Sequence, residues 1–111
     1  MYYTYMIRCI DNSIYTGITN NLKRRMSEHF DKTEKCAKYT LRHTPKKIEA
    51  VWESENRTLS SKLEYRIKSL KKCDKEVLIK DNTKIDYILS NKIECNLYRR
   101  IARQEINELI K

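Results

Sequence analysis

The sequence has only one glycine, Gly17, and only one proline, Pro45. Because these residues mark turns and flexible linkers, a second domain joined by a linker is not expected. At 111 residues, 40% of them apolar, the chain has room for one domain with a modest core. The lone glycine cannot be compositional background, so some feature at its position requires a glycine.

The four cysteines form no CxxC pair and have no histidine at a zinc-ligand spacing, which argues against a structural zinc site. They are Cys9, Cys36, Cys73 and Cys95. No basic-then-apolar leader opens the sequence, and no apolar run approaches membrane-spanning length. We therefore expect a cytoplasmic protein with free thiols and no membrane partner.

Acidic residues are few compared with basic ones: 15 Asp and Glu stand against 24 Lys and Arg, for a net charge of +9 and a pI near 9.4. A polyanion, with nucleic acid first, is the natural partner of such a surface. An AT-rich genome produces the same abundance of Lys, Asn, Ile and Tyr. Charge alone therefore favours nucleic-acid binding and a merely solvated surface equally.

Strand and turn residues open the sequence. Residues 2–10 are rich in β-branched and aromatic types, residues 11–13 supply turn chemistry, and residues 14–16 resume the strand pattern, which together predict a β-hairpin. Thr19 or Asn20 can cap a following helix that ends near Phe30. The inward stripe of that helix consists of Leu22, Met26, His29 and Phe30.

The remainder of the chain is less regular at first. Residues 31–47 have no clear period and are dense in Lys, Arg, His and Thr, which predicts a long basic loop whose length hints at function. Residues 48–53 alternate as a strand, with Ile48, Ala50 and Trp52 facing the core. A second helix is marked by Leu59, Leu63, Ile67 and Leu70, and two more are expected beyond Lys75.

This order predicts an α+β fold: a small mixed three-stranded sheet flanked by helices. We assign residues 1–79 to the principal domain. Residues 80–111 are expected to form a helical C-terminal extension that packs on the domain, mediates a homodimer, or contacts DNA through Arg99, Arg100 and Arg103, with the core or dimer role as the default.

Several short motifs occur in this same order. They are Tyr3-Thr4-Tyr5, Tyr15-Thr16-Gly17, the segment from Asn21 to His29, Ala37-Lys38-Tyr39-Thr40, and the segment from Leu63 to Lys68. With them the chain resembles the GIY-YIG nuclease family, in its compact single-domain branch, over roughly residues 2–75. The resemblance implies a metal-dependent endonuclease that hydrolyses phosphodiester bonds in DNA, in repair, recombination or mobile-element processing.

Phosphodiester hydrolysis needs a cation for the phosphate charge, a proton acceptor for water, and stabilisation of the departing oxygen. Arg25 lies at the edge of the buried stripe, whereas Arg24 points about 100° further round into solvent. Because a planar guanidinium suits a phosphate, we favour phosphate contact by Arg25 over the alternative of a surface ion pair. His29 lies one turn after Arg25; its spacing alone favours a hydrogen-bonded core-edge histidine, and the resemblance implies a role at the scissile phosphate.

Glu64 is the candidate metal ligand that the resemblance implies, because one carboxylate with substrate phosphate and water is a usual way to hold Mg²⁺, or Mn²⁺ in its place. Spacing alone favours a structural role for this carboxylate. Ser61 to Glu64 would form a helix capping box, or Glu64 would pair with Lys68.

Tyr5 and Tyr15 are both candidates for the residue that deprotonates or orients water. A free phenol has a pKa of about 10 and needs nearby cations to act as a base at neutral pH. By default each would be a core aromatic of a half-buried hairpin. Gly17 either lets the backbone bend or lets DNA approach closely, the alternative being an ordinary turn glycine.

The residues expected to bind nucleic acid are Gly17, Lys23, Arg24, Lys38, Tyr39, Arg42 and Lys46. The chain departs from the family at Tyr3, where the first motif usually has glycine, and at residues 74–77, where many longer members place an asparagine. A rival hypothesis therefore stays open: a non-catalytic, basic nucleic-acid-binding module of the same fold. A third makes the C-terminal helices an oligomerisation element.

Overall fold

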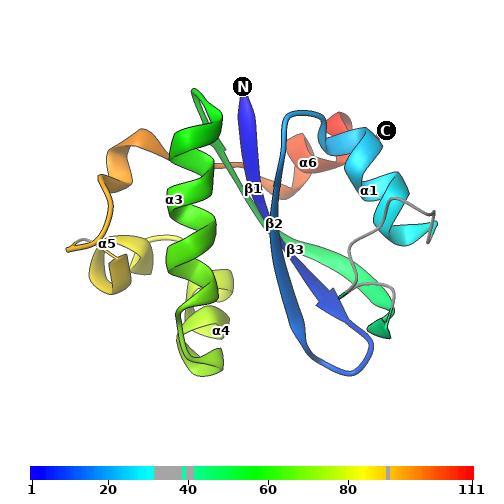
Figure 1. Ribbon diagram of the computed structural model, residues 1–111, viewed down its shortest axis with the longest axis horizontal. Helices are drawn as coiled ribbons and strands as arrows, with labels where there is room; N and C mark the ends of the chain where they lie inside the picture. The colour runs from blue at the N-terminus through cyan, green and yellow to red at the C-terminus, as the bar shows by residue number, and fades with distance from the viewer. Residues whose placement is uncertain (32–38, 40–41, 90) are drawn as a thin grey trace.

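A computed structural model describes residues 1–31, 39, 42–89 and 91–111. A four-stranded sheet in the order β2-β1-β3-β4 forms the centre, and helices pack against it (Figure 1). The predicted α+β class is confirmed. The sheet differs from the prediction in two respects: it has four strands rather than three, and all pairings are antiparallel rather than mixed.

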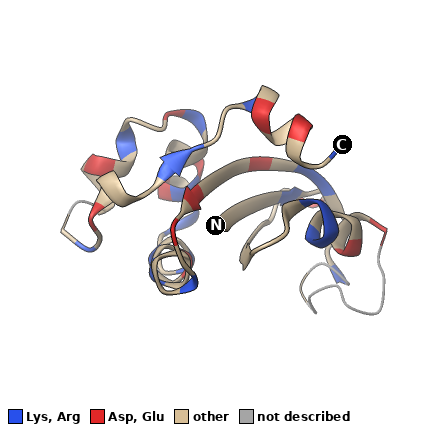
Figure 2. Cartoon of the chain, turned by 90° about the horizontal axis from the view of Figure 1, so that it is seen from above, with Lys and Arg blue, Asp and Glu red and all other residues tan. Residues whose placement is uncertain are grey.

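The predicted N-terminal hairpin is present as β1 (Tyr2–Cys9) and β2 (Ile14–Thr19). In the turn, Asn12 adopts a positive φ of 70°, a conformation that asparagine tolerates better than most residues. The Asp11 carboxylate accepts a hydrogen bond from the backbone N–H of Ser13 at 3.1 Å. Lys and Arg, blue in Figure 2, lie mainly outside these two strands, so the hairpin forms a nearly uncharged centre.

The third strand, β3 (Pro45–Ser54), pairs with β1 through an irregular register. Ala50 lies opposite Met6 while Ile48 lies opposite Ile7, so Glu49 is an extra residue at this bulge. The bulge breaks the predicted alternation: Ile48 packs on one face of the sheet and Ala50 on the other. Both faces are covered by other elements, which is why Val51 is also fully buried.

The fourth strand, β4, consists only of Arg99–Arg100 and pairs with Trp52 and Glu53 of β3. Two consecutive arginines carry no strand periodicity, so the sequence offered no sign of it. The guanidinium of Arg100 donates to the backbone oxygens of Leu78 at 3.2 Å and Ile79 at 3.1 Å. It also lies 4.9 Å from the centre of the Trp52 ring.

One face of the sheet is covered by α1 (Leu22–Phe30) and α6 (Arg103–Leu109). The start of α1 is one or two residues later than expected, because Asn21, rather than Thr19 or Asn20, accepts the capping hydrogen bond from the N–H of Arg24 at 3.0 Å. The core on this face contains Tyr5, Ile7, Cys9, Leu22, Met26, Ile48, Val51, Ile101 and Ile106.

The other face is covered by α3 (Arg57–Lys68), α4 (Lys72–Lys80) and α5 (Lys84–Leu89), followed by the short helix η1 (Cys95–Leu97). Its core contains Met6, Ala50, Trp52, Leu63, Ile67, Leu78, Ile85, Leu89 and Tyr98. Asn56 caps α3 by accepting from the N–H of Leu59 at 2.9 Å. The helix therefore begins well before Ser61, and a capping box from Ser61 to Glu64 is excluded.

The C-terminal residues contribute to both cores. Ile101 and Ile106 pack with β1 and β3, and Arg103 donates to the backbone oxygen of Ile48. Arg99 pairs with Glu53 and Glu105. The domain boundary after residue 79 and a homodimer through this segment stay predictions. Over the described ranges, no helix is long and apolar enough to cross a membrane.

Candidate active site

The centre of the candidate site is the cross-strand pair of Tyr5 on β1 and Gly17 on β2. Tyr5 is fully buried, and its ring lies against the backbone of Gly17. A Cβ atom on Gly17 would stand 2.5 Å from the Tyr5 hydroxyl and 2.7 Å from its Cζ. Gly17 is inside a strand and does not have a positive φ, so it is not a turn glycine. Its missing side chain makes room for the Tyr5 phenol.

The hydroxyl of Tyr5 forms a hydrogen bond with Nε2 of His29, at 2.7 Å. His29 stands in the last turn of α1 and is fully buried. The two ring centres are 5.6 Å apart, in an edge-on arrangement. His29 is thus a hydrogen-bonded buried histidine, as its spacing alone predicted, and its partner is one of the two candidate tyrosines.

Burial determines the protonation states of this pair. It raises the pKa of Tyr5 above its ordinary value, with a further rise from nearby Tyr15, while a hydrogen bond from Arg25 opposes the rise. Burial, with a smaller contribution from the positive charge of Arg25, lowers the pKa of His29 to about 4. At neutral pH the pair therefore consists of a protonated phenol and a neutral imidazole.

Arg25 belongs to the same cluster through α1. Its guanidinium donates to Glu28 at 2.8 Å, and its side chain is 21% exposed. The arginine therefore makes the ion pair that its spacing allowed, and its charge also acts on Tyr5 and His29. Arg24 is exposed, as predicted, and contacts the side chain of Asn20 at 3.4 Å.

Glu64 approaches the cluster from α3, on the other side of β2. It raises the pKa of Tyr5, which places its carboxylate within electrostatic reach of that phenol. Its Oε2 atom is 3.5 Å from Nζ of Lys68, so the predicted pairing with Lys68 is present. Lys68 in turn lies 5.7 Å from the centre of the Tyr15 ring. β1 and α1 thus bring Tyr5 and His29 into direct contact, and Glu64 of α3 acts on Tyr5 through its charge.

A metal at this site would rest on few protein ligands. Over the described residues, no group of three or more His, Cys, Asp or Glu side chains could hold a metal ion. Glu64 is a hard oxygen donor with a side chain 24% exposed, so it can still take a ligand from solvent. That arrangement fits Mg²⁺, which keeps several waters and commonly uses one or two carboxylates together with substrate phosphate.

Tyr15 connects the site to a column of rings. Its ring centre is 5.3 Å from that of His29 and 5.5 Å from that of Tyr39, on which it stacks. Tyr39 stacks on His43 at 4.3 Å, and Nδ1 of His43 is 2.5 Å from the Asp11 carboxylate. His43 and Asp11 could not be identified from the sequence, because the two are 32 residues apart and only the fold brings them together.

The predicted nucleic-acid contacts are dispersed. Lys23 on α1, Arg42, and Lys46 at the start of β3 are exposed. Tyr39 is half-buried in the ring column, Gly17 is buried beside Tyr5, and Lys38 lies outside the described residues. The structure thus gives Gly17 a packing role, while DNA contact by the others stays a prediction.

Comparison with known proteins agrees with this fold. Residues 1–76 match the model of the GIY-YIG catalytic domain. A UPF0213 protein of Fusobacterium nucleatum is 44% identical over 78 residues, which are 70% of this chain and 76% of the relative. A UPF0213 protein of Natronomonas pharaonis is 38% identical over 82 residues, 74% of this chain and 94% of the relative.

A solution NMR structure of a UPF0213 protein from Bacillus halodurans shares 33% identity, with 72% of this chain and 84% of that chain covered and a TM-score of 0.47. The family match and the sequence identities together define the class. The chain belongs to the GIY-YIG nuclease family. Within that family, its similarity to UPF0213 proteins places it in the compact single-domain branch.

Proposed function

We propose that the protein is an endonuclease that hydrolyses phosphodiester bonds in DNA with a divalent metal ion, Mg²⁺ or Mn²⁺. The observation that supports this most is the convergence of a phenol, a neutral imidazole, a guanidinium and a carboxylate from three different elements. Tyr5, His29 and Arg25 interact directly or electrostatically, and Glu64 acts on Tyr5 from α3. The net charge of +9 supports a polyanionic substrate.

Arg25 would bind the scissile phosphate. Its side chain is partly exposed, and a guanidinium carries several N–H donors, so contacts to Glu28 and to a phosphate oxygen can coexist. A fixed guanidinium stabilises the charge that grows on the phosphate oxygens as the nucleophile attacks. Glu28 would keep the side chain oriented before substrate arrives.

The Tyr5–His29 pair would receive the proton of the attacking water. Tyr5 alone is a poor base, because its raised pKa keeps it protonated. His29 is neutral at neutral pH, so its imidazole offers an acceptor nitrogen, and the negative charge of a bound phosphate would raise its lowered pKa. Tyr5 would take the proton from water as it passes its own to Nε2 of His29, across the 2.7 Å hydrogen bond. Tyr15 would orient the water beside this pair.

Glu64 would hold the metal ion, together with the substrate phosphate and water. When bound, such an ion supplies positive charge that stabilises the phosphate and the departing 3′ oxygen. Lys68, which pairs with Glu64, would hold the carboxylate in position before the metal binds.

The metal assignment is tested by measuring the nicking of supercoiled DNA as Mg²⁺ is titrated, with a chelator as the zero point. We expect Glu64→Gln to abolish nicking or to raise the Mg²⁺ requirement at least about tenfold. Glu108→Gln, an exposed carboxylate on α6, is the matched control and should match the wild type. Nicking that persists in chelator, or a Glu64→Gln variant with the wild-type Mg²⁺ requirement, would contradict the assignment.

The rival proposal is a binding module of the same fold without catalysis. The exposed cations on α1 and near the start of β3 support it equally. It predicts DNA binding that weakens steeply with salt and no nicking under any metal condition. The same titration therefore separates the two proposals.

A further inference from the structure

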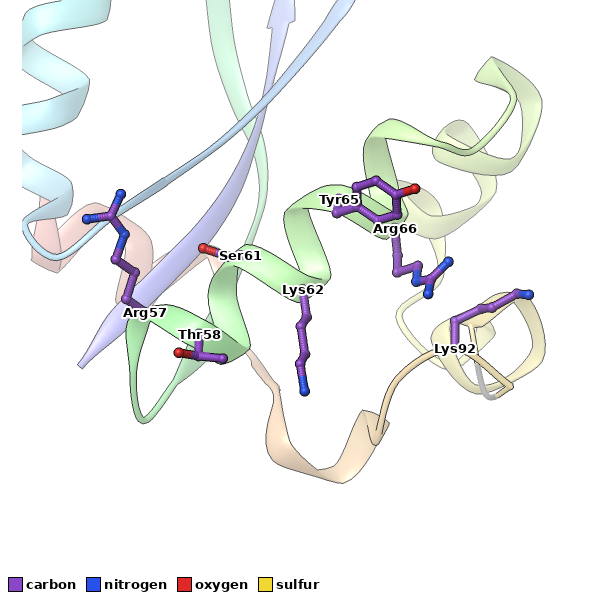
Figure 3. Close-up of a pocket in the computed structure, with 7 residues that line it drawn as sticks. All are labelled: Arg57, Thr58, Ser61, Lys62, Tyr65, Arg66 and Lys92. Carbon is purple, nitrogen blue, oxygen red and sulfur yellow. The ribbon is translucent and has the colours of Figure 1, made fainter.

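The outer face of α3 carries a groove that the proposed catalytic cluster does not use. Four cations line it, Arg57, Lys62 and Arg66 from α3 and Lys92 from the segment after α5, and none of the described acidic residues does (Figure 3). Figure 3 shows the side chain of Arg66 extending toward Lys92. The groove has a volume of about 680 Å³. It is large enough for a ligand of the size of a nucleotide.

The lining residues of α3 recur at helical spacing on one side of the helix. Its buried side consists of Ser60, Leu63 and Ile67, so the groove faces away from the sheet. From residue 57 to residue 66 the helix rises about 14 Å, at ~1.5 Å per residue. Phosphates along one DNA strand repeat about every 3.4 Å of duplex axis. The row of cations therefore spans several nucleotides.

The cations in this groove take no part in the ion pairs of the described residues. Within the part of the chain that the structure describes, none of the salt bridges involves Arg57, Lys62, Arg66 or Lys92. Arg8, Arg25, Lys47, Lys68 and Arg99 each have a carboxylate partner. Four neighbouring cations outside any described ion pair favour a polyanionic ligand. The hydroxyls of Thr58 and Ser61 add hydrogen-bond donors for phosphate oxygens.

An aromatic ring lies among these cations. Tyr65 is 63% exposed, although large aromatic side chains usually bury their rings, and the Arg66 guanidinium lies 5.2 Å from its ring centre. An exposed aromatic beside cations is the combination that binds unpaired nucleotides, because bases stack on the ring while phosphates contact the cations. The bases of an intact duplex are stacked on each other and cannot use such a ring.

The groove shares a lining residue with a second groove that reaches Arg25 of the candidate active site. Arg57 also lines a second groove, which contains Arg24, Arg25 and Glu28. Ser61, in the first groove, lies three residues before Glu64 and therefore on the same side of α3. A strand that leaves Arg25 would meet Arg57 and then Tyr65.

We propose that the α3 groove binds an unpaired DNA strand that continues from the scissile phosphate, so that the substrate is a branched, flapped or single-stranded-tailed DNA. The proposal rests on the proposed nuclease function. It makes Tyr65 the stacking platform and Arg57, Lys62, Arg66 and Lys92 the phosphate contacts.

The test is fluorescence anisotropy in chelator, where no cleavage occurs, with labelled blunt duplex and the same duplex carrying a single-stranded tail. The full-length wild type is compared with Tyr65→Ala, Tyr65→Phe and the double variant Lys62→Gln/Arg66→Gln. The matched controls are Tyr87→Ala and Lys84→Gln on α5, where an exposed tyrosine also lies beside a cation, 6.0 Å away, and neither residue lines the groove.

We expect Tyr65→Ala and the double variant each to weaken binding of tailed DNA about tenfold, and binding of blunt duplex much less. Tyr65→Phe should keep the wild-type affinity. The double variant should also reduce the salt slope for the tail by about 1.4, or ~0.7 for each lost phosphate contact. The α5 controls should be unchanged.

The proposal would be overturned if the groove variants lost affinity equally for tailed and blunt DNA, or lost none. It would also be overturned if Tyr65→Ala and Tyr87→Ala weakened binding equally. Failure of the groove proposal and failure of the nuclease proposal give different results. A wild type that nicks DNA while the groove variants bind tails normally refutes only the groove. Tail binding through the groove without metal-dependent nicking refutes only the nuclease.

Discussion

The Tyr5 hydroxyl lies 2.7 Å from Nε2 of His29, and it lies there because Gly17, its cross-strand neighbour, has no side chain. The strand pair positions the phenol, and α1 positions the imidazole. The only glycine of the chain therefore serves a contact inside the hairpin rather than a turn.

Substituting Gly17→Ala should displace Tyr5, because the new Cβ would stand 2.5 Å from the hydroxyl and 2.7 Å from Cζ. We expect a loss of about 1–3 kcal/mol in the free energy of unfolding, measured by urea denaturation. In a Tyr5→Leu background the same substitution should cost less, since the opposing ring is gone. An equal cost in both backgrounds would refute the packing role of Gly17.

His29 makes the stability depend on pH. Its pKa is about 4 in the folded protein, below its ordinary 6.5, so between these values the unfolded state binds more protons. The contribution of neutral His29 to the free energy of unfolding is complete above about pH 6.5. It declines as the pH falls toward 4, by at most ~1.4 kcal/mol per pH unit. Between about pH 7 and about pH 5, the free energy of unfolding measured by urea denaturation should fall more steeply for the wild type than for His29→Gln. Parallel declines would contradict this expectation.

Two buried threonines on the same face of the sheet should respond oppositely to valine. Over the described residues, the hydroxyl of Thr16 has no hydrogen-bond partner, whereas that of Thr4 donates to the backbone oxygen of Ser60 at 3.1 Å. Thr16→Val should be neutral or stabilise by up to ~1 kcal/mol, and Thr4→Val should destabilise by about 1 kcal/mol. Thermal or urea denaturation measures both, and a clear loss in Thr16→Val would indicate that its hydroxyl does have a partner.

The hairpin, the helix that ends at Phe30 and the amphipathic helix around Leu63 could be predicted because hydrophobic period and turn residues are local signals. The bulge at Glu49 could not, because it depends on the register between β3 and β1. Nor could the contacts of Arg8 with Glu49 and Glu76, whose residues lie up to 68 positions apart in the chain.

Only the local part of the candidate site could be predicted from the sequence. Arg25 and His29 are one turn apart on one helix, so their proximity follows from spacing. The pairing of Tyr5 with Gly17 requires the hairpin register, and the approach of Glu64 requires the packing of α3 beside β2. The ring column through Tyr39 and His43 depends on tertiary structure alone.

Arg100 should act as a structural residue rather than as a DNA contact. It donates to the backbone oxygens of Leu78 and Ile79 and lies over the ring of Trp52. Arg100→Met should cost about 2–3 kcal/mol of unfolding free energy, because two partly buried backbone oxygens lose their charged donor. Arg99→Met, at an exposed ion pair, should cost less than ~1 kcal/mol. Trp52 is the only tryptophan, so its fluorescence monitors both transitions, and equal costs would refute the assignment.

The most direct test of the proposed nuclease activity is single-turnover nicking of supercoiled DNA with Mg²⁺ by wild type, Arg25→Gln and Glu64→Gln, with circular dichroism to verify folding. We expect nicking by the wild type and a loss of at least about 100-fold in each folded variant. A folded wild type that never nicks with Mg²⁺ or Mn²⁺, or variants that nick at the wild-type rate, would contradict the proposed activity.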